Sequence, residues 1–295
     1  MATNRFPLFR LPFLPLCMIL DLYGPHEIIQ LSLCSKQSLR VAKKCWKKKE
    51  KITADLCAKK IPTFNLHFHE TAFFYRFVIF EAHDAKDQQV QHVRIGDAVV
   101  PSIHMLTETI TYWNDRIFGI GQIVSYIKDL FDVPITKIDL NSKLYKNEFI
   151  DTMDCIMKIQ ESVLDCVLRG EGPIDDCLTH LLDNCKIAGE LLIYGEPTRQ
   201  FRNDWEIHLD TIYISNGSSL TFQNLTNIEC KSLNLYCSSL TSEDLNQFLK
   251  HCMRNYTTIK RGGLDIQRND GTIGTVFMFH NFFEFGVDPI KVFSD

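Results

Sequence analysis

The chain has 295 residues, of which 45% are hydrophobic and 23% are charged, and its mean hydropathy is −0.08. This composition is typical of a soluble globular protein with one large domain or two ordinary ones, and it excludes a fibrous or low-complexity chain. No apolar run reaches the 18 residues that indicate a membrane-spanning helix, so we expect no membrane segment.

The net charge of −4 is divided unevenly along the chain. Residues 1–60 contain 12 Lys/Arg against 4 Asp/Glu, whereas residues 61–295 contain 20 against 32. Such an asymmetry predicts a domain boundary near residue 60.

The 11 cysteines do not form the pattern of a disulfide framework, because their number is odd and no Cys-x-x-Cys occurs. Six of them lie inside apolar periodic runs: Cys17, Cys155, Cys166, Cys177, Cys185 and Cys252. We expect buried thiols in a reducing compartment, the cytoplasm and/or the nucleus. The apolar run 11–20 imitates a secretion signal, but prolines interrupt it and no small-residue cleavage site follows.

Three short helices are predicted between residues 12 and 50. Pro12 suits a first helical turn, and apolar residues follow at helical spacing up to Tyr23. Gly24 ends this helix and Pro25 begins the second, which runs to about Cys34. Ser35 is the expected N-cap of the third helix.

This segment resembles the F-box, and it looks most like the nematode-type members of that family. The matching features follow one another in family order: Leu11-Pro12, Leu16 and Ile19, the passage 24–29, and the passage 31–36. The resemblance implies binding to the Skp-type adaptor of cullin-based SCF ubiquitin ligases, and through it to a cullin. It implies these adaptor-binding residues: Leu11, Pro12, Leu16, Ile19, Leu20, Ile28, Leu31, Cys34 and Val41. The alternative is that the same residues form only an internal three-helix core.

A run of lysines closes the segment, from Lys43 to Lys51. It could be a nuclear signal or a nucleic-acid patch, but we favour the solvated end of the third helix and expect no nucleic-acid partner. We therefore divide the chain into an F-box at 5–50, a helical linker at 51–61, and a substrate-recognition domain at 62–295.

The first part of the remaining chain predicts strands followed by one helix. Apolar and polar residues alternate over 62–69, and 73–82 is predicted as a second strand. Residues 83–97 are polar and predict a loop or a hairpin end. The apolar spacing over 118–131 predicts a helix.

From residue 135 onward, short strands alternate with amphipathic helices. The expected strands are 138–140, 163–167, 191–193, 212–214, 233–235 and 264–266, and the expected helices are 149–157, 174–185 and 245–253. Strand–helix units of this length predict an irregular, leucine-rich-repeat-like α/β domain with a largely parallel sheet. The last helix has a capping box formed by Thr241 and Asp244.

The passage from Leu225 to His251 resembles the type 2 F-box-associated domain that follows nematode-type F-boxes. The two resemblances together cover most of residues 5–270. The second implies that this domain recruits an unknown protein substrate.

Two weak signals for other chemistry are present. His67 and His69 could lie on one face of a strand and bind a metal, but the sequence nominates no third ligand. Gly119 and Gly121 form a fragment of a dinucleotide fingerprint without its third glycine. We expect no cofactor, no metal and no catalysis. Two alternatives stay open: an interaction module without a role in degradation, and an enzyme with an unrecognised site in 62–295.

Overall fold

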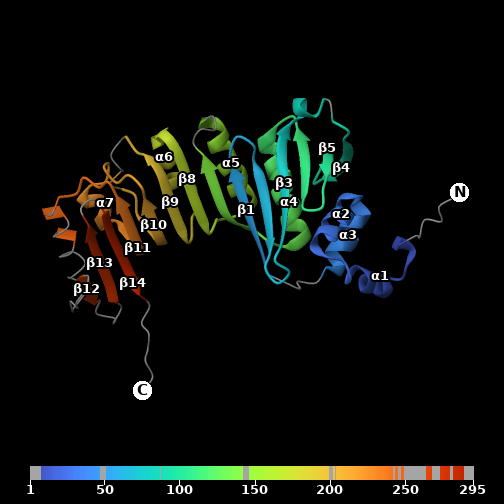
Figure 1. Cartoon of the computed structure of the whole chain (residues 1–295), viewed down its shortest axis with the longest axis horizontal. Helices are drawn as coiled ribbons and strands as arrows, with labels where there is room; N and C mark the ends of the chain where they lie inside the picture. Colours follow the sequence, from blue (N-terminus) through green and yellow to red (C-terminus); the bar gives the residue numbers. More distant parts are fainter. Residues whose placement is uncertain are drawn as a thin grey trace, which may run out of the picture. The chain divides into compact units, whose positions relative to one another are not determined.

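The structure is a computed structural model that divides into two compact units, residues 1–136 and residues 137–295 (Figure 1). It describes residues 8–46, 51–86, 88–141, 146–198, 202, 204–241, 243–244, 247–248, 264–267, 273–279 and 282–288. The boundary predicted near residue 60 is wrong, because the N-terminal helices and the strands that follow belong to one unit.

Three helices open the first unit after a short 3₁₀ turn, Leu8–Arg10. They are α1 (Phe13–Leu20), α2 (Pro25–Leu33) and α3 (Lys36–Cys45). The start of α2 is fixed by Pro25 and by the Glu27 carboxylate, which accepts from the Gly24 backbone N–H at 2.6 Å. Ser35 caps α3 by accepting from the Ser38 backbone N–H at 3.0 Å.

Six strands and one long helix complete the first unit. The strands are β1 (Ile52–Ala58), β2 (Thr63–Phe68), β3 (Phe73–Glu81), β4 (Gln91–Ile95), β5 (Ala98–His104) and β6 (Glu108–Trp113). Their order is β1-β2-β3-β6-β5-β4, and β3–β6 is a parallel pair in an otherwise antiparallel arrangement. Helix α4 (Arg116–Phe131) packs against β2, β3, β4 and β6, and a 3₁₀ turn, Ala82–Ala85, follows β3.

The helical linker predicted at 51–61 is wrong, because these residues form β1. Ala54, Leu56 and Ala58 are buried and alternate with partly exposed residues. This period of two is the spacing of a strand with one buried face. Leu56 lies opposite Phe64 in the antiparallel pairing of β1 with β2.

Of the N-terminal helices, α3 packs on α4, α2 contacts β4, and α1 packs on α3. The Tyr126 hydroxyl lies within hydrogen-bond distance of Ser32 Oγ and is 3.4 Å from the carbonyl oxygen of Ile29. The rings of Trp46 and Phe131 meet edge to face at 5.5 Å. The helices therefore share a core with the strands instead of forming a module of their own.

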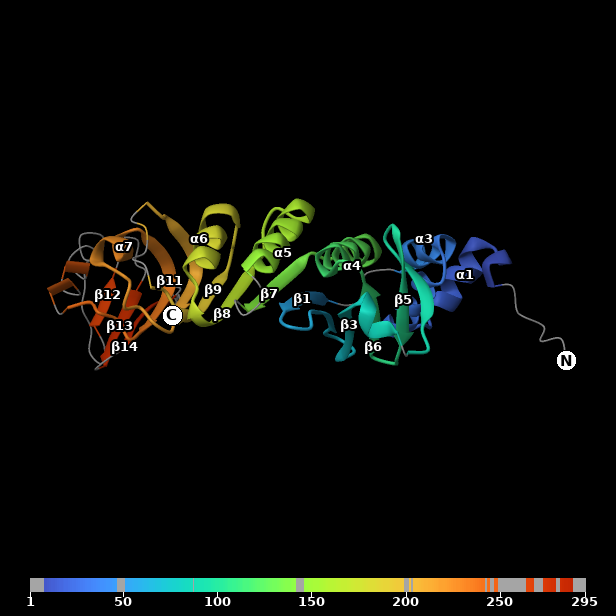
Figure 2. The ribbon, with the colours of Figure 1, turned by 90° about the horizontal axis from the view of Figure 1, so that it is seen from above.

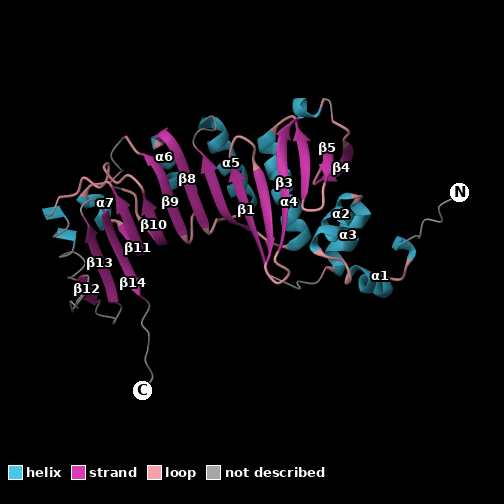
Figure 3. Ribbon diagram, in the orientation of Figure 1, coloured by secondary structure: helices cyan, strands magenta, loops and turns pink. Residues whose placement is uncertain are grey.

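The second unit alternates strands with helices (Figure 3). Its strands are β7 (Ile135–Asn141), β8 (Asp165–Pro173), β9 (Glu190–Glu196), β10 (Ile207–Ile214), β11 (Ile228–Tyr236), β12 (Leu264–Gln267), β13 (Ile273–Phe279) and β14 (Phe282–Asp288). Its helices are α5 (Lys146–Ile159), α6 (Asp175–Asn184) and α7 (Phe222–Thr226).

The strand order in this unit is β12-β13-β14-β11-β10-β9-β8-β7. Strands β7 to β11 are parallel to their neighbours, whereas β11–β14, β14–β13 and β13–β12 are antiparallel pairs. The α/β class is confirmed, and the parallel arrangement holds for β7–β11. The leucine-rich-repeat-like description stays a prediction.

Helices α5, α6 and α7 lie on one face of strands β7–β11 (Figure 2). The side chains that point to this face are buried, among them Leu140, Leu168, Ile193, Ile214 and Leu235. Neighbouring residues along each strand point to the other face, because side chains alternate along a strand. Of the predicted helix 245–253, residues 247–248 are described and helical, whereas residues 245–246 and 249–253 lie outside the described residues.

Candidate protein-docking surface

Helix α1 and the turn after it expose four large apolar side chains. They are Phe13, Leu14, Met18 and Leu22, which are 59%, 72%, 63% and 84% exposed. Leu14, Met18 and Leu22 are spaced by four residues, so they follow one side of the helix. We call these four residues the α1 stripe.

The opposite side of α1 faces the interior. Leu16 and Leu20 are 4% and 2% exposed, and they hold the helix on the rest of the unit. A short helix that is apolar on all sides normally lies inside a protein or under a partner. Contiguous exposed apolar side chains mark interaction sites far more often than single ones do. The α1 stripe is therefore the candidate protein-docking surface of this unit.

The adaptor-binding residues that the F-box resemblance implies are not the residues of the α1 stripe, and most of them are buried or half-buried. Leu16, Leu20 and Ile28 are buried, so they support the helices from within. The half-buried members are Leu11, Ile19, Leu31 and Val41, and the exposed members are Pro12 and Cys34.

The stripe itself was missed by sequence reasoning. The sequence of α1, FLPLCMIL, contains no charged or polar residue that would mark its outer side. Helical periodicity identifies a buried face only where a polar face alternates with it.

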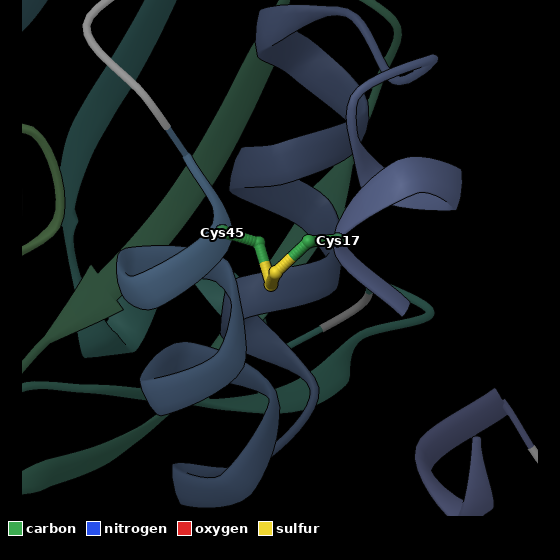
Figure 4. The surroundings of a disulfide bond; sticks show 2 residues. All are labelled: Cys17 and Cys45. Carbon is green, nitrogen blue, oxygen red and sulfur yellow. A yellow bond between two sulfur atoms is a disulfide. The ribbon is translucent and has the colours of Figure 1, made fainter. Parts of the chain in front are cut away.

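A disulfide between Cys17 and Cys45 ties α1 to the end of α3, with a Cα–Cα distance of 4.9 Å (Figure 4). The expectation of a free buried thiol at Cys17 is wrong, because the packing of α1 on α3 brings together two cysteines 28 residues apart. The bond fixes the position of the helix that carries the stripe.

The other described cysteines are thiols. Burial raises the pKa of the Cys166 thiol far above its usual range, and burial together with Asp154 raises the pKa of Cys185 to about 12. A thiol is a nucleophile or a metal ligand only as the thiolate. These two residues therefore act as small apolar side chains, as expected from their periodicity, whereas Cys252 lies outside the described residues.

The two histidines considered for a metal site are engaged with other groups. His67 Nε2 lies 3.1 Å from an Asp55 oxygen, and His69 Nε2 lies 3.1 Å from Thr53 Oγ1. Within the described ranges, no group of three or more His, Cys, Asp or Glu side chains is arranged to hold a metal ion.

The glycines considered for a dinucleotide site lie inside α4. A Cβ atom on Gly119 would come within 2.7 Å of the Trp113 ring, so this glycine permits the close packing of α4 on Trp113. No described helix is long and apolar enough to cross a membrane.

A groove of about 540 Å³ opens between α2, α3, α4 and the turn from β4 to β5. Its walls carry Lys36, Arg40 and Arg94, together with an ion pair between Lys43 and Asp129. Neither a histidine nor a cysteine lines it. It therefore lacks the residue pairs that usually activate a serine or cysteine nucleophile.

Comparison with known proteins bears on the second unit. Residues 200–258 match the family model described as F-box associated. The match covers about a fifth of the chain, and it shows what these residues are similar to. This region includes β10, α7 and β11, and it ends beyond the capping box, in which Thr241 Oγ1 accepts from the Asp244 backbone N–H at 3.2 Å. The predicted resemblance to F-box-associated proteins is confirmed.

The chain is also similar to an uncharacterized protein of Caenorhabditis elegans, with 20% identity over 273 residues. The alignment covers 86% of this chain and 59% of that protein, so the chain spans less than two thirds of its relative. No solved structure matches the chain.

Proposed function

We propose that this chain is the substrate-recognition subunit of a cullin-based SCF ubiquitin ligase. Helices α1–α3 act as the F-box and bind the Skp-type adaptor, which links the chain to a cullin. The second unit, with its F-box-associated region, binds a protein target. The chain performs no chemistry of its own; it raises the effective concentration of the target near the conjugating enzyme, in the cytoplasm and/or the nucleus.

The α1 stripe is the observation that supports this proposal. It places four large apolar side chains on the outside of a segment whose motif order resembles the F-box. Complete burial of one such side chain contributes about 1.5–3 kcal/mol. Four of them suffice for the core of a protein interface, in which a few central residues supply most of the affinity.

The test is binding of the full chain to a purified Skp-type adaptor. We expect Leu14→Ser together with Met18→Ser to weaken adaptor binding by at least about 100-fold, because interface anchors contribute about 2–4 kcal/mol each. Both side chains are more than half exposed, so the substitutions leave the core intact.

Leu106→Ser is the matched control. Leu106 is 67% exposed, as an apolar residue of the same unit between β5 and β6, and its replacement should leave adaptor binding unchanged. Adaptor binding that survives the double substitution in α1 would refute the docking site. Ubiquitylation of the captured target separates a ligase subunit from an interaction module without a role in degradation.

A further inference from the structure

Three tyrosines form a row across the parallel strands of the second unit. Tyr194 on β9 and Tyr213 on β10 have ring centroids 4.9 Å apart, and Tyr213 and Tyr236 on β11 are 5.3 Å apart. Their strand neighbours Ile193, Ile214 and Leu235 are buried on the face that the helices cover. The tyrosine row therefore lies on the other face, where no described helix packs (Figure 2).

One end of the row already holds a cation. The guanidinium carbon of Arg169 on β8 lies 4.7 Å from the centroid of the Tyr194 ring. Arg169 Nε also donates to Asp139 on β7 at 3.0 Å. This face thus combines an aromatic ring with a carboxylate to hold an arginine, and the pair leaves no net charge.

Exposed carboxylates share this face. Glu190 and Glu196 lie on β9 at even spacing from Tyr194, so their side chains point to the same face as its ring, and both are exposed. Neither has an ion pair among the residues that the structure describes. Residues 137–295 as a whole carry 15 Lys/Arg against 23 Asp/Glu, a net charge of −8.

In the first unit, two polar pairs join neighbouring strands. Asp55 pairs with His67, and Arg76 pairs with Glu108. The face with the tyrosine row offers electron-rich ring faces and two exposed carboxylates.

We propose that the tyrosine row binds a short, extended, basic segment of a protein partner, whose Arg or Lys side chains lie on the rings of Tyr194, Tyr213 and Tyr236. Aromatic faces attract such cations through their quadrupole, and the nearby carboxylates add charge complementarity. The row spans about 10 Å, which corresponds to roughly three residues of an extended chain. This inference rests on the proposed function in taking the partner to be the ligase target.

The test is fluorescence anisotropy of the full chain with a labelled peptide of alternating Arg and Ser. We expect saturable binding at peptide concentrations below about 1 mM, and weaker binding as salt rises from about 50 to about 500 mM. Peptides with Glu or Pro in place of Arg should not bind. Equal binding of the Pro or Glu peptide would overturn the assigned chemistry, and no binding of the Arg peptide would overturn the site.

Substitutions in the row separate ring contacts from general attraction to an acidic surface. Tyr213→Leu together with Tyr236→Leu keeps the net charge but removes two ring faces, and should raise the dissociation constant about 10-fold. Tyr213→Phe together with Tyr236→Phe keeps the rings and should bind within about twofold of the original chain.

The matched control is Phe74→Leu. Phe74 is 37% exposed, the same fraction as Tyr236, and lies on β3 of the first unit. An equal loss in this control, or no loss in the double Leu variant, would overturn the role of the row. The peptide assay needs no adaptor, so loss of adaptor binding alone would refute the proposed function without touching this inference.

Discussion

The hydroxyl groups of Ser32 on α2 and Tyr126 on α4 connect the N-terminal helices to the rest of the first unit, and each can be removed by one substitution. Ser32 Oγ donates to the carbonyl oxygen of Ile29 at 2.7 Å and lies within hydrogen-bond distance of the Tyr126 hydroxyl, which also donates to that carbonyl oxygen at 3.4 Å. Both side chains are buried. Burial raises the pKa of Tyr126 strongly, so this hydroxyl stays protonated and available as a donor at all working pH values.

The two single substitutions should have unequal effects. Tyr126→Phe removes the hydroxyl contacts to Ser32 and Ile29 but leaves Ser32 bonded to Ile29, so we expect it to lower the free energy of unfolding by about 1 kcal/mol. Ser32→Ala leaves the buried Tyr126 hydroxyl with only the 3.4 Å contact to Ile29, so we expect a larger loss, about 1–3 kcal/mol. In the double variant the losses should not add, because both remove the same contact.

The assay is urea unfolding of the full chain and of the three variants, with hydrogen exchange to follow α2 and α4 separately. We expect α2 and α4 to lose protection together in each variant, since they share this contact. Ser125→Ala is the matched control, because Ser125 is an exposed neighbour on α4. If α2 lost protection while α4 kept it, the helices would be an autonomous module and the shared core would be refuted.

Two further predictions concern the first unit. Reduction of the Cys17–Cys45 disulfide should lower the free energy of unfolding of this unit by about 3–4 kcal/mol, because the bond closes a loop of 28 residues. Urea unfolding with and without reductant measures this loss. The Cys45→Ser variant is the control, and its unfolding should not respond to reductant. Burial lowers the pKa of His104, so the unfolded chain binds the proton more tightly. Stability should therefore be complete above the unfolded pKa of about 6.5 and fall as pH drops below it. His104→Asn should remove this part of the pH dependence of the urea midpoint, and an unchanged dependence would contradict it.

Most strands and helices of the second unit could be predicted because their periodicity is strong. The segment 233–235 lies inside β11, and the segment 149–157 lies inside α5. Apolar side chains on one face, with turn residues between elements, suffice to define such units. Parallel pairing follows where a helix connects consecutive strands, as α5 does between β7 and β8 and α6 does between β8 and β9.

The first unit was predicted less well for two physical reasons. Strands β4, β5 and β6 are paired mainly through antiparallel neighbours and contain polar buried residues, such as Ser102, Thr109 and Thr111. Hydrogen bonds satisfy these hydroxyls, for example that of Thr111 to the carbonyl oxygen of Val78, and a sequence pattern cannot reveal them. In β1 the lysines on both sides of the strand obscured its alternation and favoured a helical linker.

The sequence also could not show which residues of the two candidate sites are exposed. Leu14 and Leu16 are chemically identical and two residues apart, yet one is 72% exposed and the other is 4% exposed. Only the packing of α1 on its neighbours decides which of them can meet a partner. The tyrosine row depends likewise on the register of three strands, since a shift of one residue would turn the rings toward the helices.

The two surfaces differ in the physical force that each can use. The α1 stripe offers only apolar side chains, so a partner gains affinity there by burying area, and salt screening does not weaken that gain. The tyrosine row acts through charge and ring quadrupoles on a partly exposed sheet face, where salt reduces the attraction. If the proposed function holds, added salt should therefore weaken binding of the target at the tyrosine row while leaving binding of the adaptor at the α1 stripe unchanged.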